Sequence, residues 1–493
     1  MKMIGHSIGG RAVDGTSDRT APVFDPARGE QTAEVAIASA AEVDGVVKVA
    51  VDASAAWGDS SLSRRTAMLF RLRELLDSHR DDLAALVTAE HGKVLSDAMG
   101  EVARGLECVE FACGIPHLLK GSHSSEVSTG VDVHTLLRPL GVVAGITPFN
   151  FPVMVPLWMA ANALACGNAF LLKPSEKDPS ASLMLADLVR QAGFPEGVFN
   201  VVQGDVETVG ALLSHPGIDA VSFVGSTLVA RDVYETGTRN GKRVQALGGA
   251  KNHMVVLPDA DVDAAADEAV SAGYGSAGER CMAISVVVAV GSVGDALVDA
   301  IAARIPGVVV GPGDDAASMM GPLITSEHRS RVRSYVERAA DEGASVVVDG
   351  SAAVTDRGFF VGCSLLDRVK PGMRVYDDEI FGPVLSVVRA ATFDDAVELV
   401  NANPYGNGVA LFTNDGGAAR RFERAAEVGM VGINVPIPVP VGWHSFGGWK
   451  ASMFGGAPIY GPEGIRFYTR PKVITSRWPD PASSAISLGF PTN

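Results

Sequence analysis

The chain has 493 residues, too many for a single hydrophobic core, so two or three domains are expected. Hydrophobic content of 47% and charged content of 20% are typical of a soluble globular protein. The net charge of −16 argues against nucleic acid or an anionic membrane as a partner. Five cysteines without paired spacing, and an N-terminus without an apolar signal run, predict free thiols in a reducing cytoplasm.

The first part of the chain is predicted to form an arm of short strands followed by amphipathic helices. Residues 1–40 are polar and rich in turn residues. Apolar residues then recur every three or four positions over 41–57, 63–90 and 95–119, which indicates helices. Residues 121–139 are small and polar with alternating apolar positions, and they predict an exposed hairpin that needs a partner to cover it.

From residue 141, apolar runs alternate with amphipathic stretches, which predicts a parallel sheet covered by helices on both faces. The expected strands are 141–146, 169–173, 198–202, 220–224 and 243–247, and the expected helices are 152–166, 180–192, 206–214 and 227–238. A second alternation from His253 to about Asn434 predicts a second α/β domain. Residues 151–172 lack charge but contain Pro and Asn, which favours a buried helix and strand over a membrane span.

The stretch 273–284 carries the strongest chemical signal. Small and flexible residues lead into the pair Arg280–Cys281, and a β-branched run follows. A thiol on a loop beside a guanidinium is suited to nucleophilic attack, because the cation favours the thiolate. The alternative is a buried structural cysteine. The chain has no HExxH motif, Cys/His cluster or P-loop, so no metal site is predicted.

Three strand ends of the first sheet carry residues suited to a dinucleotide, which binds at the carboxyl edge of such sheets. Residues 147–152 hold the Asn150 amide in a proline-bracketed turn. Residues 173–177 offer lysines and the Glu176 carboxylate at the height of a ribose. Residues 225–227 offer a glycine and hydroxyls at a helix N-terminus, suited to phosphate. Each is also compatible with an ordinary βα turn, but three at one edge predict a dinucleotide site.

These motifs together resemble the aldehyde dehydrogenase superfamily. The resemblance covers nearly the whole chain and rests on Pro148-Phe149-Asn150-Phe151-Pro152, Lys173-Pro174-Ser175-Glu176, Phe223-Val224-Gly225-Ser226, Gly278-Glu279-Arg280-Cys281 and Glu379-Ile380-Phe381-Gly382-Pro383. It implies an α/β fold with a Rossmann-like parallel-sheet cofactor domain, an α/β catalytic domain and a small β oligomerisation element. It also implies that Cys281 attacks an aldehyde and that the adduct gives a hydride to NAD.

The resemblance implies a role for each matching residue. The Asn150 amide and the Cys281 backbone N–H would hold the oxyanion. Cofactor contacts would come from Thr147, Phe149, Lys173, Glu176, Lys177, Ser226, Gly248 and Glu379. Among these, Lys173 and Glu379 would hold the riboses, and Glu176 would repel a 2′-phosphate and so favour NAD over NADP.

The chain departs from the family at the base that activates water. Hydrolytic members carry a Glu in a Glu-Leu-Gly-Gly stretch. Counting back from Cys281 places Leu247 at that position, and no Asp or Glu occurs from Thr236 to Pro258. An acyl-enzyme without that base is expected to persist until a better nucleophile arrives, such as the thiol of coenzyme A.

With this departure the chain resembles one branch of the family, the CoA-acylating methylmalonate-semialdehyde (malonate-semialdehyde) dehydrogenases. The stretches 146–152, 248–253, 275–283 and 446–450 also resemble that branch. In such enzymes the acyl group forms a thioester with the cysteine and loses its carboxylate. It is then transferred to CoA, which gives propionyl-CoA or acetyl-CoA. Arg104 and Arg280 stand where that branch holds the substrate carboxylate. Arg104 is also compatible with a surface ion pair among neighbouring acids.

Three other functions stay open: a hydrolytic aldehyde dehydrogenase, a redox-inactive binding or structural relative, and a thiol acyltransferase without a redox step. The expected NAD-binding domain comprises residues 1–120 and 139–250, with 435–465 returning to it. The catalytic domain spans 251–434. Residues 121–138 and 466–493 are expected to pair between subunits in a homotetramer, because exposed strand edges need pairing.

Overall fold

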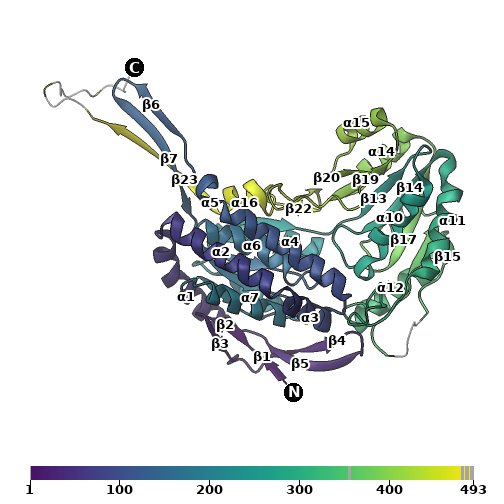
Figure 1. The fold of residues 1–493 in the computed structure, drawn as a ribbon, viewed down its shortest axis with the longest axis horizontal. Helices are drawn as coiled ribbons and strands as arrows, with labels where there is room; N and C mark the ends of the chain where they lie inside the picture. Colours follow the sequence, from purple (N-terminus) through teal and green to yellow (C-terminus); the bar gives the residue numbers. More distant parts are fainter. Residues whose placement is uncertain (1, 353–356, 479–481, 483–487, 489–493) are drawn as a thin grey trace.

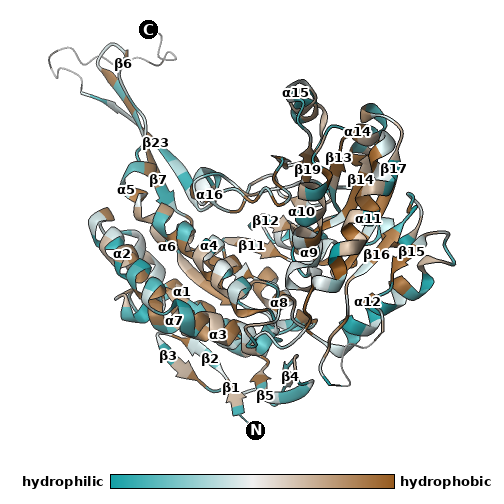
Figure 2. Cartoon of the chain, turned by 45° about the vertical axis from the view of Figure 1, so that its right-hand side comes forward, coloured by the Kyte–Doolittle hydropathy of each residue, from teal (hydrophilic) through white to brown (hydrophobic). Residues whose placement is uncertain are grey.

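The computed structural model describes residues 2–352 and 357–478, together with Ala482 and Leu488. Two large sheets, each flanked by helices, form the two halves of the body, and a slender arm projects from one half (Figure 1). The strands of both sheets are strongly hydrophobic, while the helices turn hydrophilic residues outward (Figure 2). The predicted α/β class with parallel sheets is confirmed.

The first sheet has eight strands in the order β22-β12-β11-β8-β9-β10-β2-β3. Its bounds are β22 Met453–Phe454, β12 Arg243–Leu247, β11 Ala220–Val224, β8 Val142–Ile146, β9 Ala169–Lys173, β10 Phe199–Val201, β2 His6–Ile8 and β3 Arg11–Val13. The five strands from β12 to β10 are parallel, as the alternation of apolar runs predicted. The added strands β22, at one edge, and β2, next to the other edge strand β3, are antiparallel to their neighbours.

Helices cover both faces of this sheet, and each face has its own apolar core. One core lies under α1 Ala40–Gly58, α8 Val206–Ser214 and α9 Thr227–Arg239. The other lies under α2 Leu62–Ser78, α3 Arg80–His91, α4 Leu95–Cys113, α6 Met154–Ala165 and α7 Ser180–Gln191. The uncharged stretch 151–172 is the buried α6 followed by β9. Within the described part of the chain, no helix is long and apolar enough to cross a membrane.

Two of the predicted helices are divided in the structure. The helix expected over 63–90 breaks at His79, whose backbone leaves the helical region (φ −112°, ψ 23°). The helix expected over 95–119 ends at Cys113, and α5 Ile115–Leu118 starts afresh with Pro116 in its first turn. Proline has no N–H to continue the hydrogen-bond ladder, so a new helix begins there.

The second sheet has seven strands in the order β15-β16-β17-β14-β13-β19-β20. The bounds are β15 Ser345–Val348, β16 Ser364–Asp367, β17 Val384–Ala390, β14 Ile284–Val290, β13 Asn252–Val256, β19 Gly408–Phe412 and β20 Met430–Ile433. Its helices are α10 Val262–Tyr274, α11 Gly294–Arg304, α12 Ser326–Ala339, α13 Arg374–Asp377, α14 Phe393–Ala402 and α15 Gly416–Ala425. All neighbouring pairs except β15–β16 are parallel.

Shorter elements complete the fold. A small sheet joins β1 Lys2–Ile4, β5 Glu30–Ala36 and β4 Thr20–Asp25, and a two-stranded sheet joins β18 Tyr405–Gly406 and β21 Trp449–Lys450. The 3-10 turns are η1 Gly275–Gly278, η2 Gly291–Val293 and η3 Ile305–Gly307, and α16 Gly461–Phe467 precedes the last strand.

The arm is a three-stranded sheet in the order β23-β7-β6 (Figure 1). The predicted hairpin is β6 His123–Ser128 with β7 Val131–Pro139, and its partner comes from the same chain. Strand β23, Thr469–Arg477, pairs antiparallel with all nine residues of β7. The two segments therefore cover one another, and the outer edges that are left belong to β6 and β23. Residues 479–481, 483–487 and 489–493 of the predicted oligomerisation element lie outside the described residues.

Candidate active site

Cys281 lies on a tight loop between the two sheets. Helix α10 ends at Tyr274, and the turn η1 follows with positive φ at Ser276 and Ala277, both 52°. The Cys281 carbonyl accepts side-chain amides from Asn252 at 2.9 Å and Asn407 at 3.0 Å. Among the described cysteines, Cys281 is partly exposed and the other four are buried. The loop therefore presents this one thiol in a fixed place.

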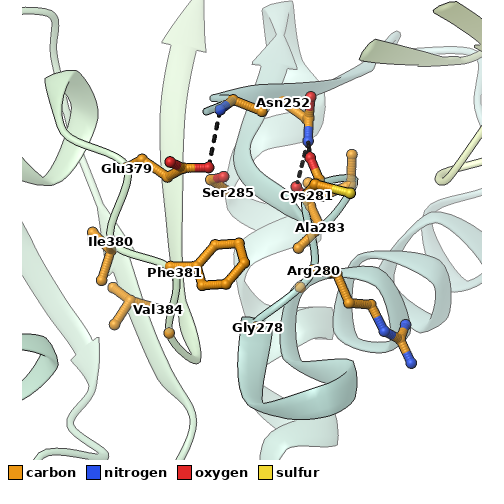
Figure 3. A pocket seen from close by; sticks show the side chains of 14 residues that line it. Asn252, Gly278, Arg280, Cys281, Ala283, Ser285, Glu379, Ile380, Phe381 and Val384 are labelled. Atoms are coloured by element: carbon orange, nitrogen blue, oxygen red, sulfur yellow. Dashed lines mark hydrogen bonds between the residues drawn. The ribbon is translucent and has the colours of Figure 1, made fainter. Parts of the chain in front are cut away.

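Arg280 lowers the pKa of Cys281, as expected, but this effect does not produce a resting thiolate. Burial and the nearby Glu379 carboxylate raise the pKa of Cys281 to about 12, and the opposing effect of Arg280 is small. The Arg280 side chain points away from the sulfur (Figure 3) and forms an ion pair with Asp97 in the first turn of α4. The neighbouring charge is thus neutralised by another helix, so adjacency in sequence does not produce a resting thiolate.

Asn150 follows β8 and is buried beside the nucleophile loop. Its Nδ2 donates to the Glu279 backbone carbonyl at 3.0 Å, which leaves its second amide hydrogen for an oxyanion. The Asn150 backbone carbonyl accepts the Lys93 ammonium at 2.6 Å. Lys93 also forms a buried ion pair with Glu101 at 2.8 Å. The amide is therefore clamped through both its side chain and its backbone.

Lys93 and Glu101 were not predicted as site residues. Glu101 also accepts two backbone N–H groups at the start of α6, from Val153 at 2.7 Å and Met154 at 3.1 Å. Its sequence signal is a carboxylate on the apolar face of α4, where Ala98, Val102 and other neighbours are buried. A charge on such a face needs a buried partner.

A cavity of about 580 Å³ opens from Cys281 along the carboxyl edge of the first sheet. It is lined by the predicted residues Phe149, Asn150, Lys177, Ser226, Gly248, Glu379 and Cys281. His328, Arg331, Tyr335 and Tyr405, which were not predicted, also line it. Residues from both sheets thus enclose one space with the nucleophile at one end.

The lining of this cavity fits a dinucleotide. Ser226 is the N-cap of the 13-residue helix α9, yet its hydroxyl makes no capping bond and the first turn holds no acidic residue. Those free N–H groups are suited to a pyrophosphate. At Gly249 a Cβ atom would lie 2.3 Å from Glu379 Oε2, so a side chain there would displace that carboxylate. These groups suit NAD.

Three predicted cofactor residues, Thr147, Lys173 and Glu176, are not among the described residues that line this cavity. Lys173 at the end of β9 pairs with Glu176 at 3.4 Å. Burial lowers the pKa of Lys173, and Glu176 opposes this effect. The Lys177 ammonium lies 4.8 Å from the centre of the Phe149 ring, inside the cavity.

Glu379 faces Cys281 across the second pocket that the nucleophile lines (Figure 3). Its Oε1 accepts the Ala250 backbone N–H at 2.9 Å, and burial raises the pKa of this carboxyl. The buried Lys251 holds the preceding turn through the Val375 and Asp378 carbonyls, at 2.9 and 2.7 Å. Burial lowers the pKa of Lys251 to about 8.

The two predicted substrate arginines are both engaged by carboxylates. Arg104 on α4 forms an ion pair with Glu107 at 3.0 Å, and its side chain is 41% exposed. It lines a small pocket with Tyr460 and Trp158, whereas Arg280 lines the pocket of Cys281. The structure therefore shows the ion pair that was the alternative explanation for Arg104.

The position expected for a water-activating carboxylate holds the buried Leu247 at the end of β12. Asp378 and Glu379 supply the carboxylates among the described residues that line the large cavity. No group of three or more His, Cys, Asp or Glu in the described part of the chain could hold a metal ion. The geometry is that of a partly exposed cysteine at one end of a cavity that fits a dinucleotide, without a carboxylate at the Leu247 position.

The model of the aldehyde dehydrogenase family matches residues 12–474, and the chain belongs to this family. A malonate-semialdehyde dehydrogenase from Pseudomonas aeruginosa is 50% identical over 100% of both chains. A methylmalonate-semialdehyde dehydrogenase structure from Oceanimonas doudoroffii is 51% identical with a TM-score of 0.96, covering 98% of this chain and 99% of that one. A provisionally assigned methylmalonate-semialdehyde dehydrogenase from Sinorhizobium meliloti, complexed with NAD, is 49% identical with a TM-score of 0.97 and coverage of 98% and 99%.

Proposed function

We propose that this protein is an NAD-dependent, CoA-acylating dehydrogenase of malonate semialdehyde, methylmalonate semialdehyde or both. The observation that carries the proposal is Leu247, an apolar side chain where a hydrolytic enzyme needs its base. The similarity to malonate- and methylmalonate-semialdehyde dehydrogenases at about half identity supports the substrate class. A thioester at Cys281 would then be protected from water and available to a thiol.

The chain's own residues supply the first half of the reaction. Cys281 loses its proton to solvent and its sulfur adds to the aldehyde carbon, while the free Asn150 amide hydrogen and the Cys281 backbone N–H stabilise the oxyanion. NAD, when bound, accepts a hydride. Phe149, Lys177, Ser226 and Glu379 would position it, because they line the cavity that ends at the sulfur. Oxidation of the Cys281 adduct leaves a thioester.

The second half begins with that β-carboxy thioester. The bond between the α-carbon and the carboxylate breaks, CO2 leaves, and the electron pair moves into the thioester carbonyl. A proton from solvent then completes the propionyl or acetyl group. The CoA thiolate attacks the carbonyl carbon and displaces the Cys281 thiolate, which regenerates the enzyme.

Arg280 and Arg104 are the candidates for binding the substrate carboxylate. Arg280 is the better placed of the two, because it lines the Cys281 pocket. A substrate carboxylate must compete with Asp97 for Arg280 and with Glu107 for Arg104. Guanidinium groups have five donors, so a second carboxylate can also join without full displacement of the first.

The competing function is a hydrolytic aldehyde dehydrogenase, and Glu379 favours it because this carboxyl lies in the same cavity as Cys281. Rapid mixing with NAD and malonate semialdehyde, with and without CoA, separates the two. The acylating function predicts a burst of about one NADH per Cys281 and turnover only after CoA is added. Fast turnover without CoA would establish hydrolysis instead. Under hydrolysis, Glu379→Gln would abolish that turnover.

We propose the domain division expected from the sequence: 1–120 and 139–250 with 435–465 for NAD, 251–434 for catalysis, and 121–138 with 466–493 for oligomerisation. The open edges of β6 and β23 support pairing in a homotetramer. The free cysteines support a cytoplasmic location.

A further inference from the structure

A buried carboxyl group lies two residues before the nucleophile, and the reaction described above does not use it. Glu279 is 0% exposed, and its Oε1 accepts the Ile324 backbone N–H at 3.3 Å. Its Oε2 has no hydrogen-bond partner among the described residues. Buried carboxyl oxygens without partners are rare, because desolvation is costly.

Two histidines face this carboxyl from different helices. His91, at the end of α3, has its Nε2 3.7 Å from Oε2, and this nitrogen is likewise buried without a partner among the described residues. His328, in α12, has its Nε2 3.7 Å from Oε1. Both distances lie just outside hydrogen-bond range.

Both histidines present N–H groups rather than lone pairs. His91 Nδ1 accepts the Lys93 backbone N–H at 3.3 Å, so its neutral ring carries the proton on Nε2, toward Glu279. His328 Nε2 donates to the Phe381 carbonyl at 2.6 Å. Burial lowers the pKa of both histidines, that of His328 to about 4, so both are neutral at pH 7.

The other charges that act on this cluster are all cationic. Lys93 and Lys177 face Glu279 from the loops after α3 and β9, and Arg331 acts on His328 from α12. Lys93 is itself paired with Glu101. Burial nevertheless dominates and raises the pKa of Glu279 to about 8. The group is therefore mostly neutral at pH 7 and surrounded by donors able to receive its charge.

Glu279 also connects the parts of the active site. Its backbone carbonyl accepts the Asn150 amide, the proposed oxyanion donor, at 3.0 Å. Through His328 its side chain reaches the Phe381 carbonyl, two residues beyond Glu379. The backbone here is constrained, with φ of 73° at Gly278 and 57° at Phe381. Glu279 is thus connected to the nucleophile loop and to the loops that carry Asn150 and Phe381.

We propose that Glu279 is a positioning residue for the dehydrogenase reaction. In its neutral form, the carboxyl accepts the Ile324 N–H, lies between His91 and His328, and keeps its own peptide carbonyl aligned with the Asn150 amide. Loss of its proton draws the two histidine N–H groups inward, pulls His328 from the Phe381 carbonyl and displaces the oxyanion donor. This inference rests on the proposed function, since it concerns formation of the Cys281 thioester.

The test is the pH dependence of the NADH burst, measured from pH 6 to 10 for the natural enzyme, Glu279→Gln and a control. In the natural enzyme, the rate constant of the NADH burst should rise about tenfold per pH unit as the Cys281 thiolate forms. It should then level off above about pH 8 as Glu279 ionises. Glu279→Gln cannot ionise, so its rate should keep rising and exceed the natural value by at least about tenfold at pH 10. The control Asp367→Asn removes a buried carboxyl that pairs with Arg389, and its profile should match the natural one.

Alkylation of Cys281 by iodoacetamide supplies an internal reference, because that reaction needs the thiolate but no oxyanion donor. The natural enzyme and Glu279→Gln should show the same alkylation slope across this pH range. If Glu279→Gln does not fold, His91→Phe serves instead: loss of one donor to the anion should move the plateau upward by about one pH unit.

The inference is overturned if the burst rate of Glu279→Gln levels off at the same pH as that of the natural enzyme. It is also overturned if the burst rate of His91→Phe levels off at that pH. Absence of any CoA-dependent NADH burst in the natural enzyme, at every pH and with both semialdehydes, is a different result. It would overturn the proposed function rather than the role of Glu279 alone.

Discussion

Asp97 pairs with Arg280, the residue directly before the nucleophile, although 183 positions separate them in the chain. Helix α4 thereby takes the guanidinium away from Cys281 and holds it at the rim of the nucleophile pocket. The arginine that looks like a thiol activator in the sequence is, in the fold, paired with a carboxylate of another helix.

Asp97→Asn is expected to lower the KM for malonate semialdehyde and to leave kcat unchanged. The carboxylate competes with the substrate for Arg280, and a partly exposed ion pair is worth up to about 1 kcal/mol, or about three- to fivefold in KM. Steady-state kinetics with CoA in excess measures this. Asp187→Asn, which removes an exposed carboxylate paired with Arg190, is the matched control. A rise in KM would instead mean that Asp97 orients Arg280.

Lys93→Met should destabilise the protein strongly, because it leaves Glu101 as an unpaired buried carboxylate. Breaking a buried ion pair costs about 3–5 kcal/mol. The double variant Lys93→Met/Glu101→Leu removes both charges and should recover most of that free energy of unfolding, measured by urea denaturation. The NADH burst should be slower than that of the natural enzyme in both variants, since both lack the Lys93 ammonium that holds the Asn150 carbonyl. If the single and double variants have the same free energy of unfolding, the loss of stability does not come from breaking the Lys93–Glu101 ion pair.

The raised pKa of Cys281 predicts how the free enzyme reacts with iodoacetamide. Only the thiolate reacts, and below a pKa of about 12 the protonated thiol predominates. The alkylation rate should therefore climb about tenfold per pH unit from pH 7 to 10 without levelling off. Peptide mass spectrometry assigns the modified thiol, and Cys281→Ser should abolish this labelling. A plateau below pH 8 would show an activated resting thiolate.

The open edge of β23 predicts the oligomerisation surface. Val473 is 65% exposed on this strand, and Val473→Asp should place a charge at the expected subunit contact and dissociate the proposed tetramer. Light scattering at micromolar concentration measures the mass. Val206→Asp, on α8 in the body, is the control, because Val206 is 79% exposed but lies outside the arm. A natural enzyme that is already monomeric would contradict the expectation.

Local sequence determined most of the fold. The strands β9, β11 and β12 begin and end at the predicted residues, because each is a short apolar run bounded by turn residues in a parallel sheet. Helix boundaries were less exact where capping decides them, as at His79, whose non-helical backbone divides one amphipathic stretch into α2 and α3. Cys281, Asn150 and the missing carboxylate at Leu247 could also be read from motif and spacing.

The tertiary structure alone decided which charges meet. Burial sets the protonation of Cys281 and Glu279, and a residue's depth does not follow from its neighbours in the chain. The buried Lys93–Glu101 pair and the Asp97–Arg280 pair join segments that only the packing of α4 brings to the nucleophile. Pairing of β23 with β7 likewise depends on contacts between distant segments of the chain. Short-range patterns specify elements, whereas electrostatics depends on distance in space.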